Sequence, residues 1–284
     1  MSKGLAWRAE AVAYDAARAL LRLAGFDRAS AWGARALGAI GPRTSKQRVV
    51  LRNLEIAFPG LDAAERQRLS KAAWVSMGRT FFEFPVMDRL DLDSRVEVIG
   101  AGHLRRDTPC IVVTGHFANW EVMAAVLAAS PLDVAITYRR INNPHIDARV
   151  RDQRRAYGVE SLVPKSGPAG ARHLLAALKS GRSVALLGDQ KFNTGLSVPF
   201  FGEPAMTAPG AVRMALQTGA PILPMSCRRD GTRFVVTVEE AWMPEGVESG
   251  VERVVAFTER VIRAQPEQWF WAHRRWPKGV YSER

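Results

Sequence analysis

From residue 110 onward, short apolar runs alternate with longer segments whose apolar residues recur at helical spacing. Short apolar runs rich in branched residues are typical of buried strands, and the intervening segments are long enough for helices. Strands separated by helices indicate βαβ units and a mostly parallel sheet. The expected strands are 110–114, 134–138, 159–163, 184–187, 222–226 and 234–238, and the expected helices are about 118–129, 144–157, 168–179, 209–218 and 248–264.

The first third of the chain is expected to be mostly helical. Residues 5–24, 28–40 and 45–57 show helical spacing, and a fourth helix begins at Asp62. The sequence Asp62-Ala-Ala-Glu65 resembles a capping box, in which each of the two side chains accepts the backbone N–H of the other residue. We therefore predict an α/β protein with a mostly parallel central sheet flanked by helices and a helical N-terminal segment. Residues 1–90 form that segment and 91–284 the α/β core, as one compact unit.

The charge of the chain points to an acidic partner. Lys and Arg number 40 against 28 Asp and Glu, a net charge of +12. A basic surface attracts nucleic acid, an anionic membrane surface or an acidic carrier protein, and charge alone does not choose between them. The expected helix at 144–157 concentrates this charge, either as a solvated face or as a docking surface for an acidic carrier or lipid phosphates. Its basic residues are Arg149, Arg151, Arg154 and Arg155.

Contact with a membrane is expected to be peripheral or monotopic. The longest charge-free run, Met214–Cys227, has 14 residues and contains glycine and proline, whereas spanning a bilayer takes about 20 apolar residues. The N-terminus lacks the apolar core of a secretory signal, so we expect the chemistry to face the cytoplasm. Residues 5–24 form an amphipathic helix that either packs on the main domain or lies in a membrane interface with its arginines at the headgroups.

The sharpest motif is Gly115-His116-Phe117-Ala118-Asn119-Trp120-Glu121, which follows an apolar strand and opens a helix. In open α/β sheets, ligands bind beyond the carboxyl ends of strands. If Glu121 lies in the first helical turn, its carboxylate can fold back to the His116 imidazole, fix its tautomer through Nδ1 and leave Nε2 as a base. Such a base contributes about 10²–10⁴-fold in rate. The alternative is a histidine that packs at a strand end beside a capping carboxylate.

Other chemistries lack their sequence signatures. The chain has no Gly-x-Ser-x-Gly elbow, phosphate-binding loop, His-Glu-x-x-His or dinucleotide fingerprint. Cys110 and Cys227 lie in apolar runs, where we expect them to be buried and reduced, and no zinc-type spacing is present. A base without a nearby protein nucleophile implies direct transfer to a substrate hydroxyl, with no metal or cofactor.

The motif resembles that of the late acyltransferases of lipid A biosynthesis, the lauroyl and myristoyl acyltransferases. They belong to the lysophospholipid acyltransferase superfamily, whose usual motif has Asp where this chain has Glu121. Six further blocks follow the family in the same order and indicate the family rather than the substrate. They are Arg48…Asn53-Leu54…Phe58-Pro59, Tyr138-Arg139…Asn143-Pro144, Gly188-Asp189-Gln190, residues 198–207, Gly219-Ala220-Pro221 and Pro266…Trp269…His273-Arg274-Arg275-Trp276.

The resemblance implies transfer of a fatty acyl group from acyl carrier protein or coenzyme A to a hydroxyl of a phosphorylated lipid A precursor. The place would be the cytoplasmic face of the inner membrane, with residues 91–284 as the acyltransferase core and 1–90 as the membrane-associating segment. Mycobacterial acyltransferases of phosphatidylinositol mannosides are similar in motif. The first alternative is a glycerophospholipid acyltransferase that uses acyl-coenzyme A. A basic nucleic-acid-binding protein is a remote one, since no recognised module for that role is present. The acyl chain length and oligomeric state stay open.

Within this resemblance His116 is the general base, oriented by Glu121. Arg139 ends a strand and is assigned to binding a substrate phosphate. It could also stabilise the oxyanion of the reaction, together with backbone N–H groups near 117–119. The alternative to both roles is a salt bridge with a carboxylate. Asp189, which also follows a strand, would orient Arg139, accept a sugar hydroxyl or cap a turn. Asn119 binds substrate or is only a helix N-cap.

Three more segments receive provisional roles. Arg274 and Arg275 lie between Trp271 and Trp276 and are assigned to substrate binding at the membrane interface, where aromatic residues gather. The loop 199–202 either lines an acyl pocket or packs in the core. Residues 165–170 precede a helix and either bind a phosphate there or supply Ser166 as an ordinary N-cap.

Overall fold

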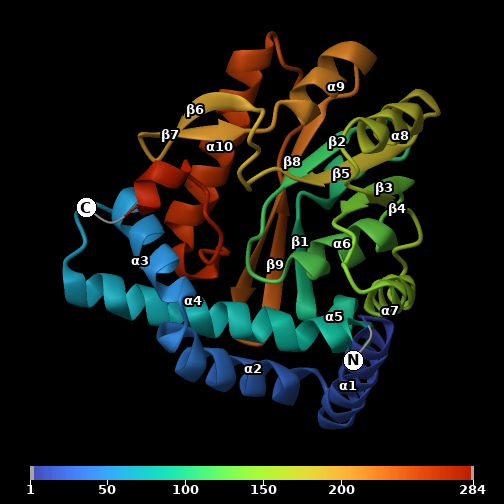
Figure 1. Ribbon diagram of the computed structural model, residues 1–284. Helices are drawn as coiled ribbons and strands as arrows, with labels where there is room; N and C mark the ends of the chain where they lie inside the picture. Colours follow the sequence, from blue (N-terminus) through green and yellow to red (C-terminus); the bar gives the residue numbers. More distant parts are fainter. Residues whose placement is uncertain (1–2, 283–284) are drawn as a thin grey trace.

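The computed structural model describes residues 3–282, and a seven-stranded sheet forms its centre (Figure 1). The strand order is β1-β9-β8-β2-β5-β3-β4. All neighbouring strands run parallel except the β8–β9 pair, so the predicted α/β class with a mostly parallel sheet is confirmed. The strands are β1 (Val96–Ile99), β2 (Ile111–Thr114), β3 (Val134–Tyr138), β4 (Leu162–Pro164), β5 (Ser183–Leu187), β8 (Ile222–Asp230) and β9 (Arg233–Val238).

Helices cover both faces of the sheet. Along β2 the side chains of Ile111 and Val113 enter one core, and Val112 enters the other, because successive residues of a strand point to opposite faces. One core also contains residues of α8 (Pro168–Lys179), α9 (Gly210–Thr218) and α10 (Val247–Ala264), and the other is covered by α6 (Trp120–Ala129). Burial on both sides explains why β2 carries apolar residues without a polar alternation.

The N-terminal helices match the expected ranges closely. They are α1 (Lys3–Ala24), α2 (Phe26–Ile40), α3 (Lys46–Ala57) and α4 (Ala63–Glu83). The predicted capping box is present, with Glu65 N donating to Asp62 Oδ1 at 2.7 Å and Asp62 N donating to Glu65 Oε2 at 2.9 Å. Helices α2 and α4 cross at Gly33 and Gly78, where a Cβ on Gly33 would lie 2.1 Å from the Gly78 carbonyl oxygen. Only glycine permits so close an approach of two backbones.

Three strands were not predicted. Residues 188–208, expected to be a long loop, contain the antiparallel hairpin of β6 (Leu196–Phe200) and β7 (Glu203–Thr207). Its two-residue turn places Phe201 at φ 53° and Gly202 at φ 80°, the left-handed pair that suits the twist of a hairpin. Phenylalanine is an unusual residue in such a turn, and each of the two strands contains a proline, which cannot donate a hydrogen bond to a neighbouring strand. For these reasons the sequence pattern predicted a loop instead of a hairpin. The third strand, β1, is short and lies among charged residues.

Helix α1 packs against α7 (Pro144–Arg155) and the short 3-10 segment η2 (Phe84–Arg89). Asp15 pairs with Arg149 of α7 at 2.6 Å, and Arg22 pairs with Asp88 of η2 at 2.6 Å. The short helix α5 (Leu92–Arg95) then leads into β1. Among the described residues no helix combines the length and apolarity that a membrane crossing requires.

Candidate active site

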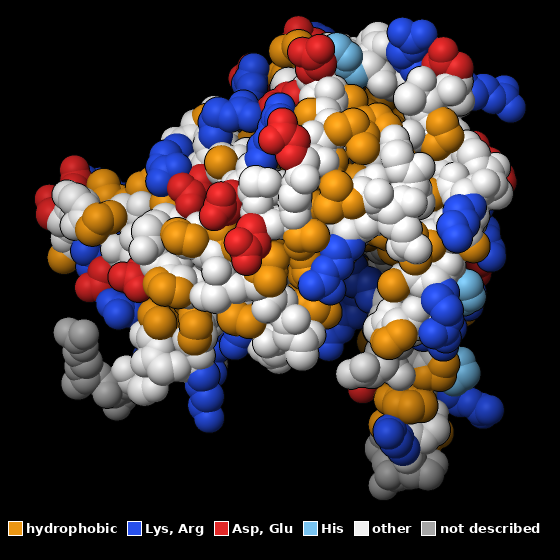
Figure 2. All heavy atoms as spheres, turned by 90° about the horizontal axis from the view of Figure 1, so that it is seen from above, with side chains coloured by type: hydrophobic (Ala, Val, Ile, Leu, Met, Phe, Trp, Pro, Cys, Tyr) orange, Lys and Arg blue, Asp and Glu red, His pale blue; other side chains and the backbone are white. Residues whose placement is uncertain are grey.

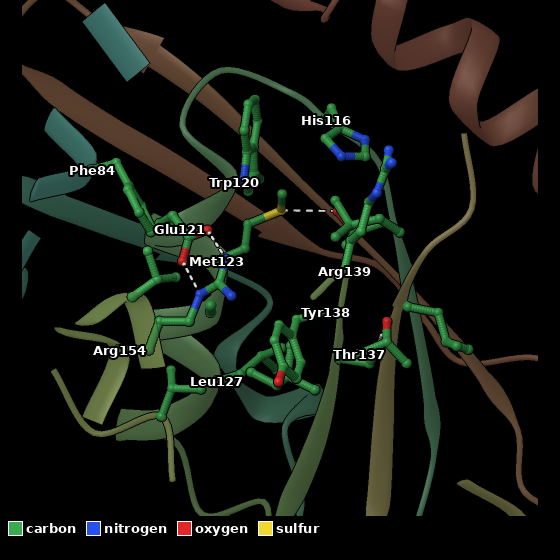
Figure 3. A pocket seen from close by; sticks show the side chains of 18 of the residues that line it. Phe84, His116, Trp120, Glu121, Met123, Leu127, Thr137, Tyr138, Arg139 and Arg154 are labelled. Atoms are coloured by element: carbon green, nitrogen blue, oxygen red, sulfur yellow. Dashed lines mark hydrogen bonds and ion pairs between the residues drawn. The ribbon is translucent and has the colours of Figure 1, made fainter. Parts of the chain in front are cut away.

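His116 lies in the turn between β2 and α6, at the carboxyl end of a central strand. It faces a cavity of about 430 Å³ that is bounded by the ends of β2, β3 and β5 and by α4, α6 and α7 (Figure 3). The position is the one that the strand–turn–helix pattern predicted. The turn itself is held from two sides, since Ala118 N donates to Gln268 O at 2.6 Å and Thr80 Oγ1 donates to Ala118 O at 2.8 Å.

The turn contains a strained backbone position. Ala118 has φ 43°, which is uncommon for a residue with a Cβ. Such a conformation costs on the order of 1–3 kcal/mol and persists only where the surroundings fix it. The hydrogen bonds on both sides of Ala118 fix it in this chain, and they thereby set the direction in which His116 leaves the backbone.

The carboxylate that holds the imidazole belongs to Asp189, which follows β5. Asp189 Oδ1 lies 2.8 Å from His116 Nδ1, while Oδ2 accepts His116 N at 2.9 Å and Trp269 Nε1 at 2.8 Å. Burial of Asp189 opposes its ionisation, but the attraction to His116, the hydrogen bonds from His116 and the attraction to His273 together outweigh it and keep the pKa of this carboxyl well below its usual range. An ionised Asp189 on Nδ1 leaves Nε2 of His116 as the nitrogen that can accept a proton.

The predicted contact between Glu121 and the imidazole is wrong. Glu121 begins α6 as expected, but its carboxylate points to α7, where it accepts Arg154 Nε at 3.0 Å, Arg154 Nη2 at 2.6 Å and the Tyr157 hydroxyl (Figure 3). Burial raises the pKa of Tyr157 well above its usual value, and the Glu121 charge adds to this rise. A buried carboxylate needs partners that compensate its charge, and Arg154 and Tyr157 of the packed segment provide them for Glu121.

Basic side chains surround the mouth of the cavity. Arg139 is exposed, and its guanidinium lies beside the His116 ring (Figure 3). Within residues 3–282 it forms no ion pair, so the salt bridge considered as its alternative role is absent. Lys165 lines the same cavity. Seen from above, the molecule is hollowed near its middle, and Lys and Arg side chains gather there (Figure 2).

The inner part of the cavity is mostly apolar, and the Glu121–Arg154 ion pair also lines it. Its lining includes side chains from α6, β3, α7 and the segment that follows α7. They are Met123, Leu127, Ile136, Val150 and Val159. Among the described residues no group of His, Cys, Asp and Glu is arranged to hold a metal ion. The cavity thus joins a base and cationic groups at its mouth to a hydrocarbon-like interior.

A family model described as bacterial lipid A biosynthesis acyltransferase matches residues 11–278. This chain belongs to that family of acyltransferases. It is 28% identical over 267 residues to the lipid A biosynthesis lauroyltransferase of Escherichia coli (strain K12), covering 87% of this chain and 85% of that protein. The lipid A biosynthesis palmitoleoyltransferase of the same organism is 28% identical over 250 residues, with 81% and 78% covered.

A relative with a different named activity is the phosphatidylinositol mannoside acyltransferase of Mycolicibacterium smegmatis (strain ATCC 700084 / mc(2)155). It is 24% identical over 230 residues, which cover 76% of this chain and 74% of that protein. The predicted membership in the lipid A acyltransferase family is confirmed, and with it the prediction that the chain is an acyltransferase enzyme.

Two further residues of the family motif have structural tasks in this acyltransferase. Asn119 is fully buried; it caps α6 by accepting Glu121 N at 3.1 Å and donates to Glu83 at 2.8 Å, so its assignment to substrate binding is wrong. Asp189 neither orients Arg139 nor reaches a sugar, because both its oxygens are engaged by His116 and Trp269.

Most of the C-terminal block, residues 266–276, packs in the protein core. Arg275 is 1% exposed and donates to Met206 O at 3.1 Å and Thr207 Oγ1 at 2.6 Å. Trp271 and Trp276 are fully buried, so the predicted membrane contact of this block is wrong for these three residues. Arg274 is exposed but lines a different cavity, beside α3, and its assignment to the substrate of this site is not supported.

The loop 199–202, the start of α8 and the arginines of α7 had alternative roles that the structure decides. Phe200 and Phe201 are buried in the core, so the loop 199–202 packs there and does not line the cavity. The N-cap of α8 is Gly167 rather than Ser166. On α7 the surface arginines pair with carboxylates, whereas Arg154 turns inward. The surface pairs are Arg149–Asp15, Arg151–Asp147 and Arg155–Asp152.

Sequence reasoning misassigned two residues of the site and missed a third. It named Asp189 without connecting it with His116, it placed Arg154 on a solvated face or a docking surface, and it gave Gln190 no role. A signal existed for the first, because Gly188-Asp189 directly follows a strand, as Gly115-His116 does. The link requires that β2 and β5 be neighbours, which they are in the structure. The order of strands along the chain does not reveal that pairing.

Proposed function

We propose that this protein transfers a fatty acyl group from an acyl thioester, carried by acyl carrier protein or coenzyme A, to a hydroxyl of a lipid A precursor. The observation that carries the proposal is the His116–Asp189 pair at the mouth of a cavity whose interior is apolar. The names of the E. coli relatives support the acceptor class. The tail of the donor would lie along Met123 and Leu127, with the thioester beside His116.

The reaction uses the imidazole twice. His116 Nε2 removes the proton of the acceptor hydroxyl while that oxygen attacks the thioester carbonyl carbon. The C–O bond forms, the carbonyl oxygen becomes an oxyanion, and on its collapse the C–S bond breaks. The departing thiolate takes the proton from Nε2. Asp189 holds Nδ1–H throughout and stabilises the imidazolium that forms between the two steps.

The acceptor phosphates would bind at the basic mouth. Arg139 presents five donors that pair with no carboxylate within residues 3–282, and a guanidinium binds phosphate through two parallel hydrogen bonds. Lys165 adds a second cation on the same rim. A glycerophospholipid acceptor also carries a phosphate, so this alternative uses the same groups. A role in nucleic-acid binding has no support in the fold or the family.

A panel of donors and acceptors tests the proposal. The donors are lauroyl, myristoyl and palmitoyl thioesters of acyl carrier protein and of coenzyme A. Each donor is incubated with the purified protein and with one acceptor: a lipid A precursor, lysophosphatidic acid or a phosphatidylinositol mannoside. Mass spectrometry identifies the products. We expect the lipid A precursor to be acylated, and His116→Ala to lower kcat about 10²–10⁴-fold. His173→Ala, an exposed histidine on α8, is the matched control. Preference for lysophosphatidic acid would reject the acceptor, and an active His116→Ala enzyme would reject the mechanism.

We also propose that α1 binds the cytoplasmic face of the inner membrane as a peripheral element. At 100° per residue, the exposed Leu5, Val12 and Leu23 share one stripe with Leu20 beside it, at 55%, 66%, 85% and 58% exposure. On the flank of this stripe, Asp15 pairs with Arg149 and Arg22 with Asp88, which ties the helix to the protein. An apolar stripe that faces outward is the arrangement of an interfacial helix.

Vesicle binding measures the contribution of this stripe. Burial of one leucine is worth about 1.5–3 kcal/mol, so the Leu20→Glu and Leu23→Glu pair is expected to weaken binding to phosphatidylglycerol vesicles about 100-fold or more. Leu216→Glu, at an exposed leucine of α9, is the matched control and should bind as the wild type does. Equal sedimentation of all three proteins with the vesicles would remove α1 from the membrane contact.

A further inference from the structure

We infer that the side-chain amide of Gln190 donates the hydrogen bond that stabilises the oxyanion of the acyl-transfer step. The inference rests on the proposed function and adds a catalytic residue to it. Gln190 follows Asp189 in the chain and lines the cavity. Its Nε2 lies 3.4 Å from Nε2 of His116, the nitrogen that receives the acceptor proton.

That position is next to the reacting atoms. In the reactive complex the acceptor hydroxyl must lie within hydrogen-bond distance of His116 Nε2. It then replaces the Gln190 amide as the partner of Nε2. The present contact of 3.4 Å is long for a hydrogen bond, so this exchange of partners needs little movement of the Gln190 side chain. The oxyanion is bonded to the same carbon as the attacking oxygen, which brings it within reach of the Gln190 amide.

Three backbone amides beside His116 already have acceptors. His116 N donates to Asp189, Phe117 N donates to Gly115 O at 2.9 Å, and Ala118 N donates to Gln268 O. The sequence-based expectation that backbone N–H groups near 117–119 form the oxyanion hole therefore loses its support at Phe117 and Ala118. A side chain that lines the cavity is the better placed donor.

Two side chains at the mouth carry suitable donors, and they differ in how firmly they are placed. Arg139 is exposed and long, which suits the capture of an acceptor phosphate. Gln190 is half-buried and directly follows Asp189, whose carboxylate is held by three hydrogen bonds. Oxyanion stabilisation depends on donors that are fixed before the charge develops. Gln190 meets that condition better than Arg139.

The test replaces the donor without changing the size of the side chain. Loss of one oxyanion donor typically lowers kcat about 10²–10³-fold, and we expect Gln190→Met to do so while the KM of both substrates changes less than about threefold. Its pH profile should match that of the wild type, since the His116–Asp189 pair is intact. An alkyl phosphonate, a charged tetrahedral mimic, should lose affinity by a factor similar to the loss in kcat, because it presents the oxyanion to Gln190.

Two more variants make the result unambiguous. Gln190→Glu keeps the shape but puts a carboxylate beside His116, so it should be slower than Gln190→Met and its pH profile should move to higher pH. Arg139→Met should mainly raise the KM of the phosphorylated acceptor. A kcat of Gln190→Met within about threefold of the wild type, or a change confined to KM, would overturn the inference. Absence of acyl transfer by the wild type in every donor–acceptor pair would instead reject the proposed function.

Discussion

Asp189→Asn is expected to lower kcat about 10³–10⁴-fold, close to the effect of removing His116. Asp189 Oδ2 accepts two N–H donors, His116 N and Trp269 Nε1. An asparagine must place its oxygen there, because an NH₂ group would face both donors. Its NH₂ group then points to Nδ1 of His116. That nitrogen becomes the acceptor, the ring proton moves to Nε2, and the base is lost.

This variant separates two assignments of the carboxylate. If Asp189 orients His116, Asp189→Asn should lower kcat far more than Glu121→Gln does, with both measured by initial rates at saturating donor and acceptor. The thermal midpoint of Asp189→Asn should be recorded alongside, since loss of the buried charge also affects stability. A folded Asp189→Asn enzyme with more than a tenth of the wild-type kcat would show that Asp189 does not orient the His116 imidazole.

Glu121→Leu is expected to lower the free energy of unfolding by about 3–5 kcal/mol, because it leaves Arg154 as a buried charge without its partner. The Arg154 side chain is 17% exposed and that of Glu121 3%, so solvent screens this pair weakly. Burial opposes the charge of Arg154, but the charges and hydrogen bonds of Glu121 and Tyr157 together outweigh it and raise the pKa of Arg154. The guanidinium stays charged in the variant as well, because arginine is not deprotonated in proteins. The Tyr157 hydroxyl would lose its acceptor as well.

The paired replacement Glu121→Leu with Arg154→Leu should recover most of the lost stability, since a buried ion pair can be replaced by apolar residues at little cost. Urea unfolding of the two single variants and of the double variant measures the coupling. Arg155→Leu, which removes a surface partner of Asp152, is the control and should change stability by at most about 1 kcal/mol. A double variant as unstable as Glu121→Leu would show that the pair does more than join α6 to α7.

The assigned roles of Glu121 and Asp189 reverse the expectation from the motif. Five residues of separation allowed Glu121 to reach the imidazole, and both carboxylates lie in the positions along the chain that the pattern gave them. Which of them meets His116 depends on the rotation of α6 about its axis and on the pairing of β2 with β5. The rotation of α6 and the pairing of β2 with β5 both depend on tertiary packing. The number of residues between His116 and each carboxylate therefore could not decide which one contacts the imidazole.

The sequence by itself determined the class of the fold, most helix boundaries and the location of the turn that carries His116. These follow from periodicity, apolar runs and capping residues, which act between neighbours in the chain, as the capping box at Asp62 does. Only the tertiary structure decided the order of the strands, the partner of His116 and the inward path of Arg154. Those depend on which distant segments share a buried space, because a buried charge or polar group takes its partner from whatever element packs against it.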